Sequence, residues 1–249
     1  LYLSLTLSLT NLRGRKIIKK LVFAPLALPL YVASFIYLGI TDYSSYISTV
    51  FRQYFNIHFN QLIDSLGPIW IGFVFSLYLS PYLTTSLILA MDSIGVNQWP
   101  VAKTLGLKNK EVIKKILLPG IAPWFFSSAM IISMETLSDF GGVSAFNFDT
   151  LATGIYTAWT GLFSYRLAVK ISLFLIFISF ILFLYDNKLK KNKTYSNKKN
   201  SQMSHPPIHL SRINEILIYI PIVIYFLLSL VIPTIYLLIW SNKRVQTFN

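Results

Sequence analysis

The chain has 249 residues, of which 54% are hydrophobic and 12% are charged, and its mean hydropathy is +0.58. Soluble domains carry about a quarter charged residues, so this composition indicates a membrane protein. The net charge of +13 does not indicate nucleic-acid binding, because the basic residues lie in short blocks between apolar runs. The chain has no cysteine, which excludes disulfides and thiolate metal sites.

Five uncharged stretches are long enough, or nearly so, to cross the hydrocarbon core as helices. Such a helix needs about 20 mostly apolar residues, because lipid offers its backbone no hydrogen bonds. The stretches are residues 21–41, 65–91, 116–134, 171–185 and 216–242, and residues 1–12 would end a sixth span. The fourth is short, so its helix is expected to begin before Lys170. Prolines inside the stretches predict kinked helices rather than loops.

Basic residues alternate along the chain and predict its orientation. Residues 13–20 carry five basic side chains, residues 92–115 have a net charge of +3, and residues 186–214 have +6. The intervening loops, 42–64 and 138–166, each have a net charge of −1. Since positively charged loops stay in the cytoplasm, the three basic segments are predicted to face inward and the two acidic loops outward.

A charged stretch, GLKNKEVIKKILLP at residues 106–119, interrupts the apolar runs. Its apolar and charged residues alternate as on a short amphipathic helix. Gly106 is expected to separate this helix from a preceding one, with a hinge between them, and Pro119 to start the next membrane helix. On the pattern alone, the segment is either an interfacial helix on lipid or a docking surface for a soluble partner.

The same stretch resembles the cytoplasmic motif of inner-membrane permeases of binding-protein-dependent ABC importers. That motif reads E-A-A, three residues, G, nine residues, I, one residue, L-P. The residues in register are Ala102, Gly106, Ile116, Leu118 and Pro119. Pro100 and Val101 replace the motif's glutamate and first alanine. The resemblance implies a coupling helix that sits in a cleft of the ATP-hydrolysing subunit, and it places Leu107 and Glu111 in the same loop.

Residues 134–159 are similar to the segment that follows the coupling loop in iron(III)-type permeases. There an E-T-L-x-D-F-G start leads to a T-x-x-T-G-I-Y-x-x-W end. The matching residues are Glu135, Thr136, Leu137, Asp139, Phe140, Gly141, Thr150, Thr153, Gly154, Ile155, Tyr156 and Trp159. The resemblance implies iron(III) as cargo. Permeases for thiamine, phosphonate, sulfate and polyamines share the overall plan, so these solutes remain alternatives.

The resemblance implies an all-α, polytopic transmembrane helix bundle with the type I ABC importer permease (MetI-like) fold. Permeases of this kind often consist of two fused halves. Residues 1–185 would then be most of the first half, with a coupling loop at 92–118. Residues 186–214, rich in Lys, Asn and Ser, would be a basic cytoplasmic linker. Residues 215–249 would form the first transmembrane helix of the second half, in a bacterial inner membrane.

The chain has no phosphate-cradling Gly-Lys-Ser/Thr loop, so we expect a transport subunit and not an enzyme. ATP and Mg would be bound by a partner ATPase dimer, with no cofactor in this chain. The other implied partners are an extracytoplasmic substrate-binding protein, the second permease half and membrane lipid. A secondary transporter or channel, or a structural membrane anchor, are alternative functions in which the coupling motif has no role.

Glu135 and Asp139 are four residues apart and are expected to share a helix face near the outward end of their span. Acids within a membrane are costly enough to suggest a function. With Tyr156 they would line the translocation path or outer gate, attract a cationic cargo, or pair with Arg166 and Lys170. A direct ferric site is a further alternative, because hard iron suits carboxylate and phenolate oxygens.

Overall fold

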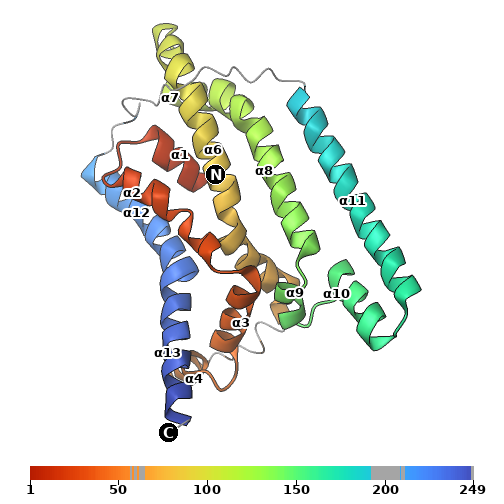
Figure 1. The fold of residues 1–249 in the computed structure, drawn as a ribbon. Helices are drawn as coiled ribbons and strands as arrows, with labels where there is room; N and C mark the ends of the chain where they lie inside the picture. Colours follow the sequence, from red (N-terminus) through yellow and green to blue (C-terminus); the bar gives the residue numbers. More distant parts are fainter. Residues whose placement is uncertain (57, 59–60, 62–64, 192–207, 209–210, 248–249) are drawn as a thin grey trace. The chain divides into compact units, whose positions relative to one another are not determined.

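The computed structural model describes residues 1–56, 58, 61, 65–191, 208 and 211–247 (Figure 1). Apart from an isolated bridge between Thr10 and Ile208, these residues contain no strand pairing, which confirms the predicted all-α class. The α-helices are α1 (Tyr2–Leu9), α2 (Arg15–Leu21), α3 (Leu30–Thr41), α4 (Tyr46–Phe55), α6 (Pro68–Thr104), α7 (Asn109–Val112), α8 (Leu118–Ser138), α9 (Gly141–Ala145), α10 (Leu151–Tyr156), α11 (Tyr165–Lys191), α12 (Arg212–Phe226) and α13 (Ile232–Thr247).

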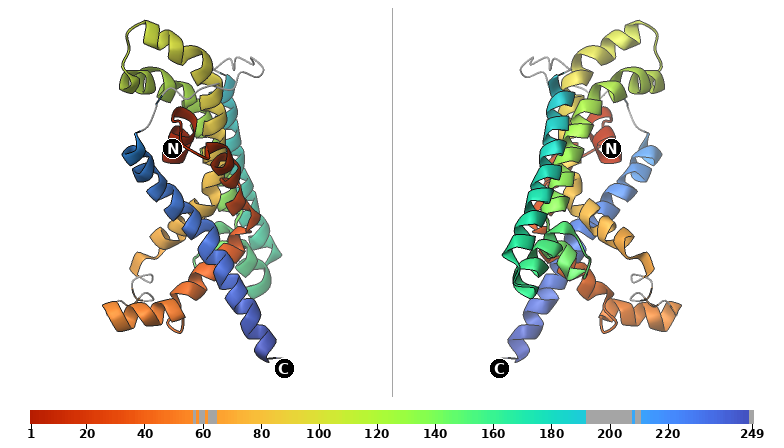
Figure 2. Two further views of the ribbon diagram at one scale, coloured as in Figure 1. Left: turned by 90° about the vertical axis from the view of Figure 1, so that its left-hand side faces the viewer. Right: turned by 90° about the vertical axis from the view of Figure 1, so that its right-hand side faces the viewer.

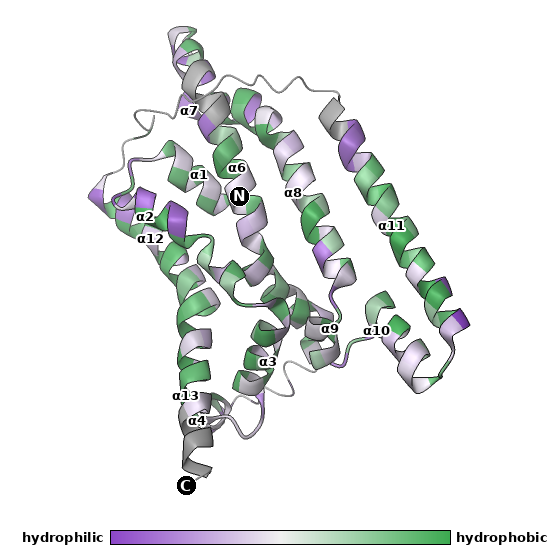
Figure 3. Ribbon diagram, viewed as in Figure 1, coloured by the Kyte–Doolittle hydropathy of each residue, from purple (hydrophilic) through white to green (hydrophobic). Residues whose placement is uncertain are grey.

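Four of the predicted stretches lie in helices long and apolar enough to cross a membrane. These segments are Pro68–Asp92, Asn109–Ser138, Tyr165–Lys188 and Arg212–Ser241. The third begins before Lys170, as its short uncharged core predicted. Figure 3 shows the middle of α11 as apolar, with polar residues toward both ends. The first part of the predicted linker is helical, because α11 continues to Lys191, and most of the rest lies outside the described residues.

The prediction of one kinked helix over residues 21–41 is wrong. Here the chain forms α2, a 3-10 turn at Ala24–Ala27, and then α3, so the pair can cross a membrane only as a broken span. Pro25 lies in the 3-10 turn and Pro29 directly precedes α3. Two prolines four residues apart remove two nearby backbone donors, which ends the helix rather than bending it. Pro81 and Pro221, each alone in its helix turn, do lie inside helices as predicted.

Two wide π turns, Ile113–Leu117 and Leu227–Val231, end two residues before Pro119 and Pro233. Proline has no N–H, and its ring collides with the carbonyl four residues earlier, so a wider preceding turn relieves the conflict. The first π turn joins α7 to α8 in one continuous helical run. A membrane helix therefore does not start at Pro119, as the sequence predicted, but ten residues earlier at α7.

The chain divides into two compact units. Unit 1 comprises Leu1–Phe23, Ser80–Met134 and Phe177–Ile222; unit 2 comprises Ala24–Leu79, Glu135–Ile176 and Val223–Asn249. Unit 1 holds 17 of the 22 Lys and Arg residues and 4 of the 9 Asp and Glu residues, a net charge of +13. Unit 2 holds 5 Lys and Arg residues and 5 Asp and Glu residues, so it has no net charge. All three basic segments of the predicted topology thus fall in unit 1.

Unit 2 has an aromatic core between α3, α6 and the C-terminal helices. Tyr37 packs edge-on against Trp70 and Tyr78, with ring centroids 6.1 and 6.4 Å away. Its hydroxyl donates to the carbonyl of Leu228 at 2.6 Å. Tyr236 likewise donates to the carbonyl of Gly39 at 2.6 Å. These bonds hold the end of α12 and the start of α13 against α3 within this unit.

Candidate functional site

The coupling loop (92–118) lies in unit 1, and its turn at Gly106 has a defined geometry. Gly106 has φ +79°, the left-handed region in which a side chain is strained. Its N–H donates to Lys103 O at 3.0 Å, and the N–H of Leu107 donates to Ala102 O at 3.2 Å. This pair of bonds is the Schellman motif, which satisfies the last carbonyls of α6. The predicted break at Gly106 is confirmed.

The helices on either side of this turn are longer than predicted. α6 runs without a break from Pro68 to Thr104, with Pro100 inside it, so no separate short helix begins there. On the other side α7 runs through the π turn into α8. The coupling loop is therefore a single turn between two helices that also contain membrane-length segments, rather than two short helices between loops.

Glu111, the acid that follows the turn at Gly106, stabilises the start of α7. Its carboxylate accepts a hydrogen bond from the N–H of Lys108 at 2.9 Å, as the third residue of a capping box does. It also lies 3.9 Å from the ammonium of Lys115, one turn along the helix. This side chain of the predicted coupling loop thus folds back on its own helix.

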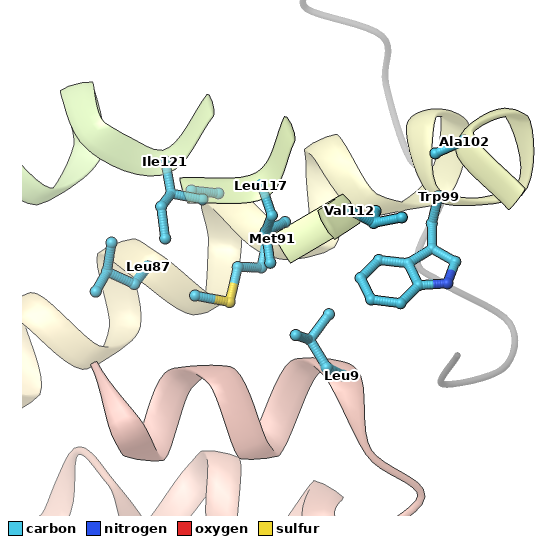
Figure 4. Packing of buried hydrophobic residues seen from close by; sticks show 9 residues of the cluster. Leu9, Leu87, Met91, Trp99, Ala102, Val112, Leu117 and Ile121 are labelled. Carbon is cyan, nitrogen blue, oxygen red and sulfur yellow. The ribbon is translucent and has the colours of Figure 1, made fainter. Parts of the chain in front are cut away.

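Three of the five motif residues pack inward. A buried apolar cluster gathers residues from α1, α6, α7, the π turn at Ile113–Leu117 and α8: Leu9, Leu87, Ala90, Met91, Trp99, Ala102, Val112, Leu117 and Ile121 (Figure 4). Leu107, Ile116 and Leu118 are half-buried against it. The resemblance implies that Ala102 packs closely against the ATPase, but this residue is only 1% exposed, so its close packing is with this chain. Gly106 and Pro119 are exposed.

The exposed apolar surface of the loop comes from two residues that do not match the motif. Val101, in the last turn of α6, and Leu105, which directly follows this helix, are 58% and 75% exposed, whereas Ala102 is buried. The loop also carries exposed lysines before and after this pair, which are Lys103, Lys108, Lys110, Lys114 and Lys115. The spacing of Val101 and Leu105 could have identified this pair from the sequence, because it places them on one helix face. The sequence-based prediction did not include this pair, because it considered only residues that match the motif or lie after its glycine.

The two acids of the predicted outer gate lie in unit 2, but not on one helix face. α8 ends at Ser138, so Asp139 falls in the turn that follows. Its carboxylate accepts hydrogen bonds from the N–H groups of Gly142 at 2.8 Å and Val143 at 3.2 Å. Asp139, one residue before the N-cap Phe140, thereby satisfies two N–H groups in the first turn of α9, which is why it leaves the line of Glu135.

The predicted ion pairs do not form within the described part of the chain. Arg166 and Lys170 are both exposed on α11, as is Glu135 on α8, and none of these side chains reaches an opposite charge there. The pKa of Asp139 is raised above its usual value by burial, which the hydrogen bonds from Val143 and Gly142 oppose. A half-buried carboxylate with two backbone donors needs no basic partner.

Several residues of the iron-type pattern have structural roles. A Cβ at Gly141 would lie 2.7 Å from the Cβ of Tyr31, so only glycine lets α9 approach α3 this closely. Thr150 and Thr153 exchange backbone-to-hydroxyl bonds of 2.7 and 3.3 Å, a capping box at the start of α10. Tyr156, at the end of α10, is 51% exposed and packs against Phe140 in a tilted arrangement, with ring centroids 4.8 Å apart. Among the described residues no three His, Asp or Glu side chains gather as metal ligands.

Comparison with known proteins gives one family. The family described as binding-protein-dependent transport system inner membrane component matches residues 2–190, more than half of the chain. No curated protein and no solved structure gives a significant match. The match and the membrane-length helices together confirm the MetI-like permease fold in a multi-pass inner-membrane protein. The chain belongs to the inner-membrane components of binding-protein-dependent transport systems, the permease subunits of ABC importers.

Proposed function

We propose that this chain forms part of an iron(III) importer and that its coupling loop receives movement from an ATP-hydrolysing partner. The observation that carries the proposal is the exposed apolar pair, Val101 and Leu105, on a loop whose own fold is complete. The buried cluster and the Schellman turn stabilise the loop without any partner. Its outer face is therefore available for binding.

The continuity of the helices favours a mechanical role. The turn at Gly106 connects α6 directly to the run formed by α7 and α8. In the proposed mechanism, the ATPase subunits close together on binding ATP and carry this turn with them. Because no flexible linker separates the turn from the two helices, its displacement tilts both of them and changes access to the translocation path.

The charge of the loop predicts the chemistry of the partner surface. An apolar pair ringed by lysines fits an apolar pocket with an acidic rim. Glu111, folded onto its own helix, leaves that surface without a competing negative charge. The acidic residue that Pro100 replaces is then not required for docking.

Support for iron(III) comes from the resemblance of residues 134–159 and from the side chains that they leave exposed. Glu135, Asp149 and Tyr156 offer carboxylate and phenolate oxygens in unit 2, the ligand atoms that suit a hard trivalent ion. In this proposal an extracytoplasmic binding protein delivers the ion, and residues 215–249 begin a second permease half. Uptake of labelled iron(III), measured against sulfate, thiamine, phosphonate and a polyamine, identifies the cargo.

The test of coupling is Leu105→Glu in the full-length permease, expressed with its ATPase. A buried negative charge in an acidic-rimmed pocket should lower ATPase co-purification and ATP-dependent uptake about tenfold or more, since interface anchors contribute about 2 kcal/mol or more. Gln53→Glu, which adds the same charge at an exposed position of unit 2, serves as the control. Assembly and uptake equal to wild type in Leu105→Glu would reject the proposed docking face. Uptake that persists without the ATPase would indicate a secondary transporter.

A further inference from the structure

α4 follows α3 after a turn of four residues and has two chemically different sides. At 100° per residue, Ile47, Val50, Phe51 and Tyr54 fall on one side of the helix. The other side carries its polar residues, which are Ser48, Thr49, Arg52 and Gln53. The helix contains no acidic residue. This amphipathic division predicts a helix that contacts an apolar environment, such as protein or lipid, on one side only.

The polar side of α4 is fixed to the end of α3. The Ser48 hydroxyl, which is 3% exposed, donates to the carbonyl of Ile40 at 3.4 Å. Ile40 belongs to the last turn of α3, which ends just before Asp42, the first charge after the apolar stretch. The middle of α4 therefore lies level with the point where the apolar stretch ends. Figure 2 shows α4 turning away from the line of α3.

Aromatic side chains of α4 and its turn are left uncovered by the described parts of the chain. Tyr46, Tyr54 and Phe55 are 82%, 78% and 64% exposed. Arg52 lies over the ring of Tyr43, 3.9 Å from the ring centroid, and donates to the carbonyl of the same residue at 3.3 Å. The one basic group of the helix is thus held at the turn, close to where lipid phosphates would lie.

We infer that α4 is an interfacial helix, with its aromatic side in the boundary between the headgroups and the acyl chains of the membrane surface where α3 ends. Its 10 residues extend about 15 Å, half of the roughly 30 Å hydrocarbon core, so it cannot cross the membrane. Tyrosine rings, apolar with a polar tip, concentrate at this boundary, and amphipathic helices lie there in the plane of the membrane. Lipid also covers the exposed apolar faces of the spans to which α4 is joined. The inference uses neither the cargo nor the coupling to ATP.

Two neighbouring exposed positions, Tyr54 and Gln53, provide a matched test. This chain has no cysteine, so Tyr54→Cys and Gln53→Cys can each carry a nitroxide without a competing thiol in these 249 residues. The labelled protein is placed in vesicles of phosphatidylethanolamine and phosphatidylglycerol. Collision rates with oxygen, which concentrates in lipid, and with a water-soluble nickel chelate are then measured by electron paramagnetic resonance. We expect the oxygen-to-nickel ratio to be several-fold higher at residue 54 than at residue 53.

Ile47→Cys, whose parent side chain lies on the same side of α4 as Tyr54, gives an independent reading and should resemble Tyr54→Cys. Equal ratios at residues 53 and 54, with free access of nickel, would place α4 in water and overturn the inference. Exclusion of both reagents at residue 54 would also overturn it, because a protein partner or a second copy of the chain would then cover the aromatic side.

Discussion

The two units of this permease hold their short helices in different ways. In unit 1, backbone motifs at Gly106 and Glu111 shape the coupling loop, which rests on one apolar cluster and presents lysines outward. In unit 2, glycines bring helices into close contact around aromatic rings, and the net charge is zero. The contrast follows from the different demands on a loop and on packed helices. Water can satisfy the backbone of an exposed loop, but the loop needs an apolar cluster of its own to be stable. Packed helices instead depend on the close approach of one backbone to another.

The largest effect on stability is expected where a glycine of unit 2 permits contact between helices. Gly141→Ala places a Cβ 2.7 Å from the Cβ of Tyr31, which cannot move without its backbone. We expect the free energy of unfolding to fall by about 1–3 kcal/mol, measured from the unfolding midpoint in detergent.

Gly72→Ala is the matched control for this substitution. Gly72 lies inside α6, in unit 2, and an alanine Cβ at this position would have no neighbouring atom within 4 Å. Alanine there should leave the free energy of unfolding unchanged or raise it by about 0.5–1 kcal/mol, because a helical glycine loses more entropy on folding. Equal losses for Gly141→Ala and Gly72→Ala would contradict the role of close approach.

In unit 1 the critical glycine is needed for its backbone angle and not for space. No atom lies near a Cβ at Gly106, but its φ of +79° strains any L side chain. Gly106→Ala should cost about 1–2 kcal/mol of unfolding free energy. Gly106→Asn should cost less, because asparagine tolerates this region. If instead Gly106→Asn loses more unfolding free energy than Gly106→Ala, side-chain size rather than backbone angle is limiting. Gly106 would then resemble Gly141, and the two units would not differ in this respect.

The capping box of α10 gives a smaller effect, of about 1 kcal/mol. Thr150→Ala removes the hydroxyl that accepts from the N–H of Thr153, whereas Thr150→Ser keeps it. Thermal unfolding should distinguish the two variants, with Thr150→Ser close to wild type. If both variants lose the same stability, the methyl group rather than the hydrogen bond stabilises this helix start.

The smallest effect concerns the pH dependence of unit 2. Burial raises the pKa of Asp139 above 3.8, so the folded protein binds this proton more tightly than the unfolded chain. The free energy of unfolding contributed by this group therefore falls as pH rises from 3.8 through the raised pKa, and is constant above it. Asp139→Asn keeps a hydrogen-bond acceptor without the titration. The stability of wild type relative to this variant should decline over that window; a rise would contradict the burial.

Features set by long stretches of sequence were predictable. Four membrane-length helices, the basic segments of unit 1 and the turn at Gly106 follow from hydropathy, charge and one glycine. Each depends on the chemistry of the residues themselves, since lipid and water partition them independently of the final packing.

Features set by contacts between distant residues were not predictable. Asp139 accepts hydrogen bonds from the first turn of α9 instead of facing Glu135, since two N–H groups beyond the end of α8 become its nearest donors. Ala102 points into a cluster completed by Leu9, 93 residues earlier.

The coupling loop also shows why a motif can mislead about a binding surface. Its recurring residues are those that build the turn and the buried cluster, so they identify the fold of the loop. Val101 and Leu105, which lie outside the matched positions, carry the exposed apolar area. A contact surface is therefore better predicted from the helix face opposite the buried motif residues than from the motif itself.

The most direct test of the coupling mechanism is site-specific crosslinking to the ATPase from two positions at the end of the α6 segment, one in the helix and one just after it. Leu105→Cys and Ala102→Cys lie three residues apart, the first at a 75% exposed and the second at a 1% exposed position. With a short thiol crosslinker in native membranes, Leu105→Cys should join to the ATP-binding subunit in an ATP-dependent way, and Ala102→Cys should not. Labelling of Leu105→Cys only from the outer side of the membrane, or only by lipid-soluble reagents, would contradict the account.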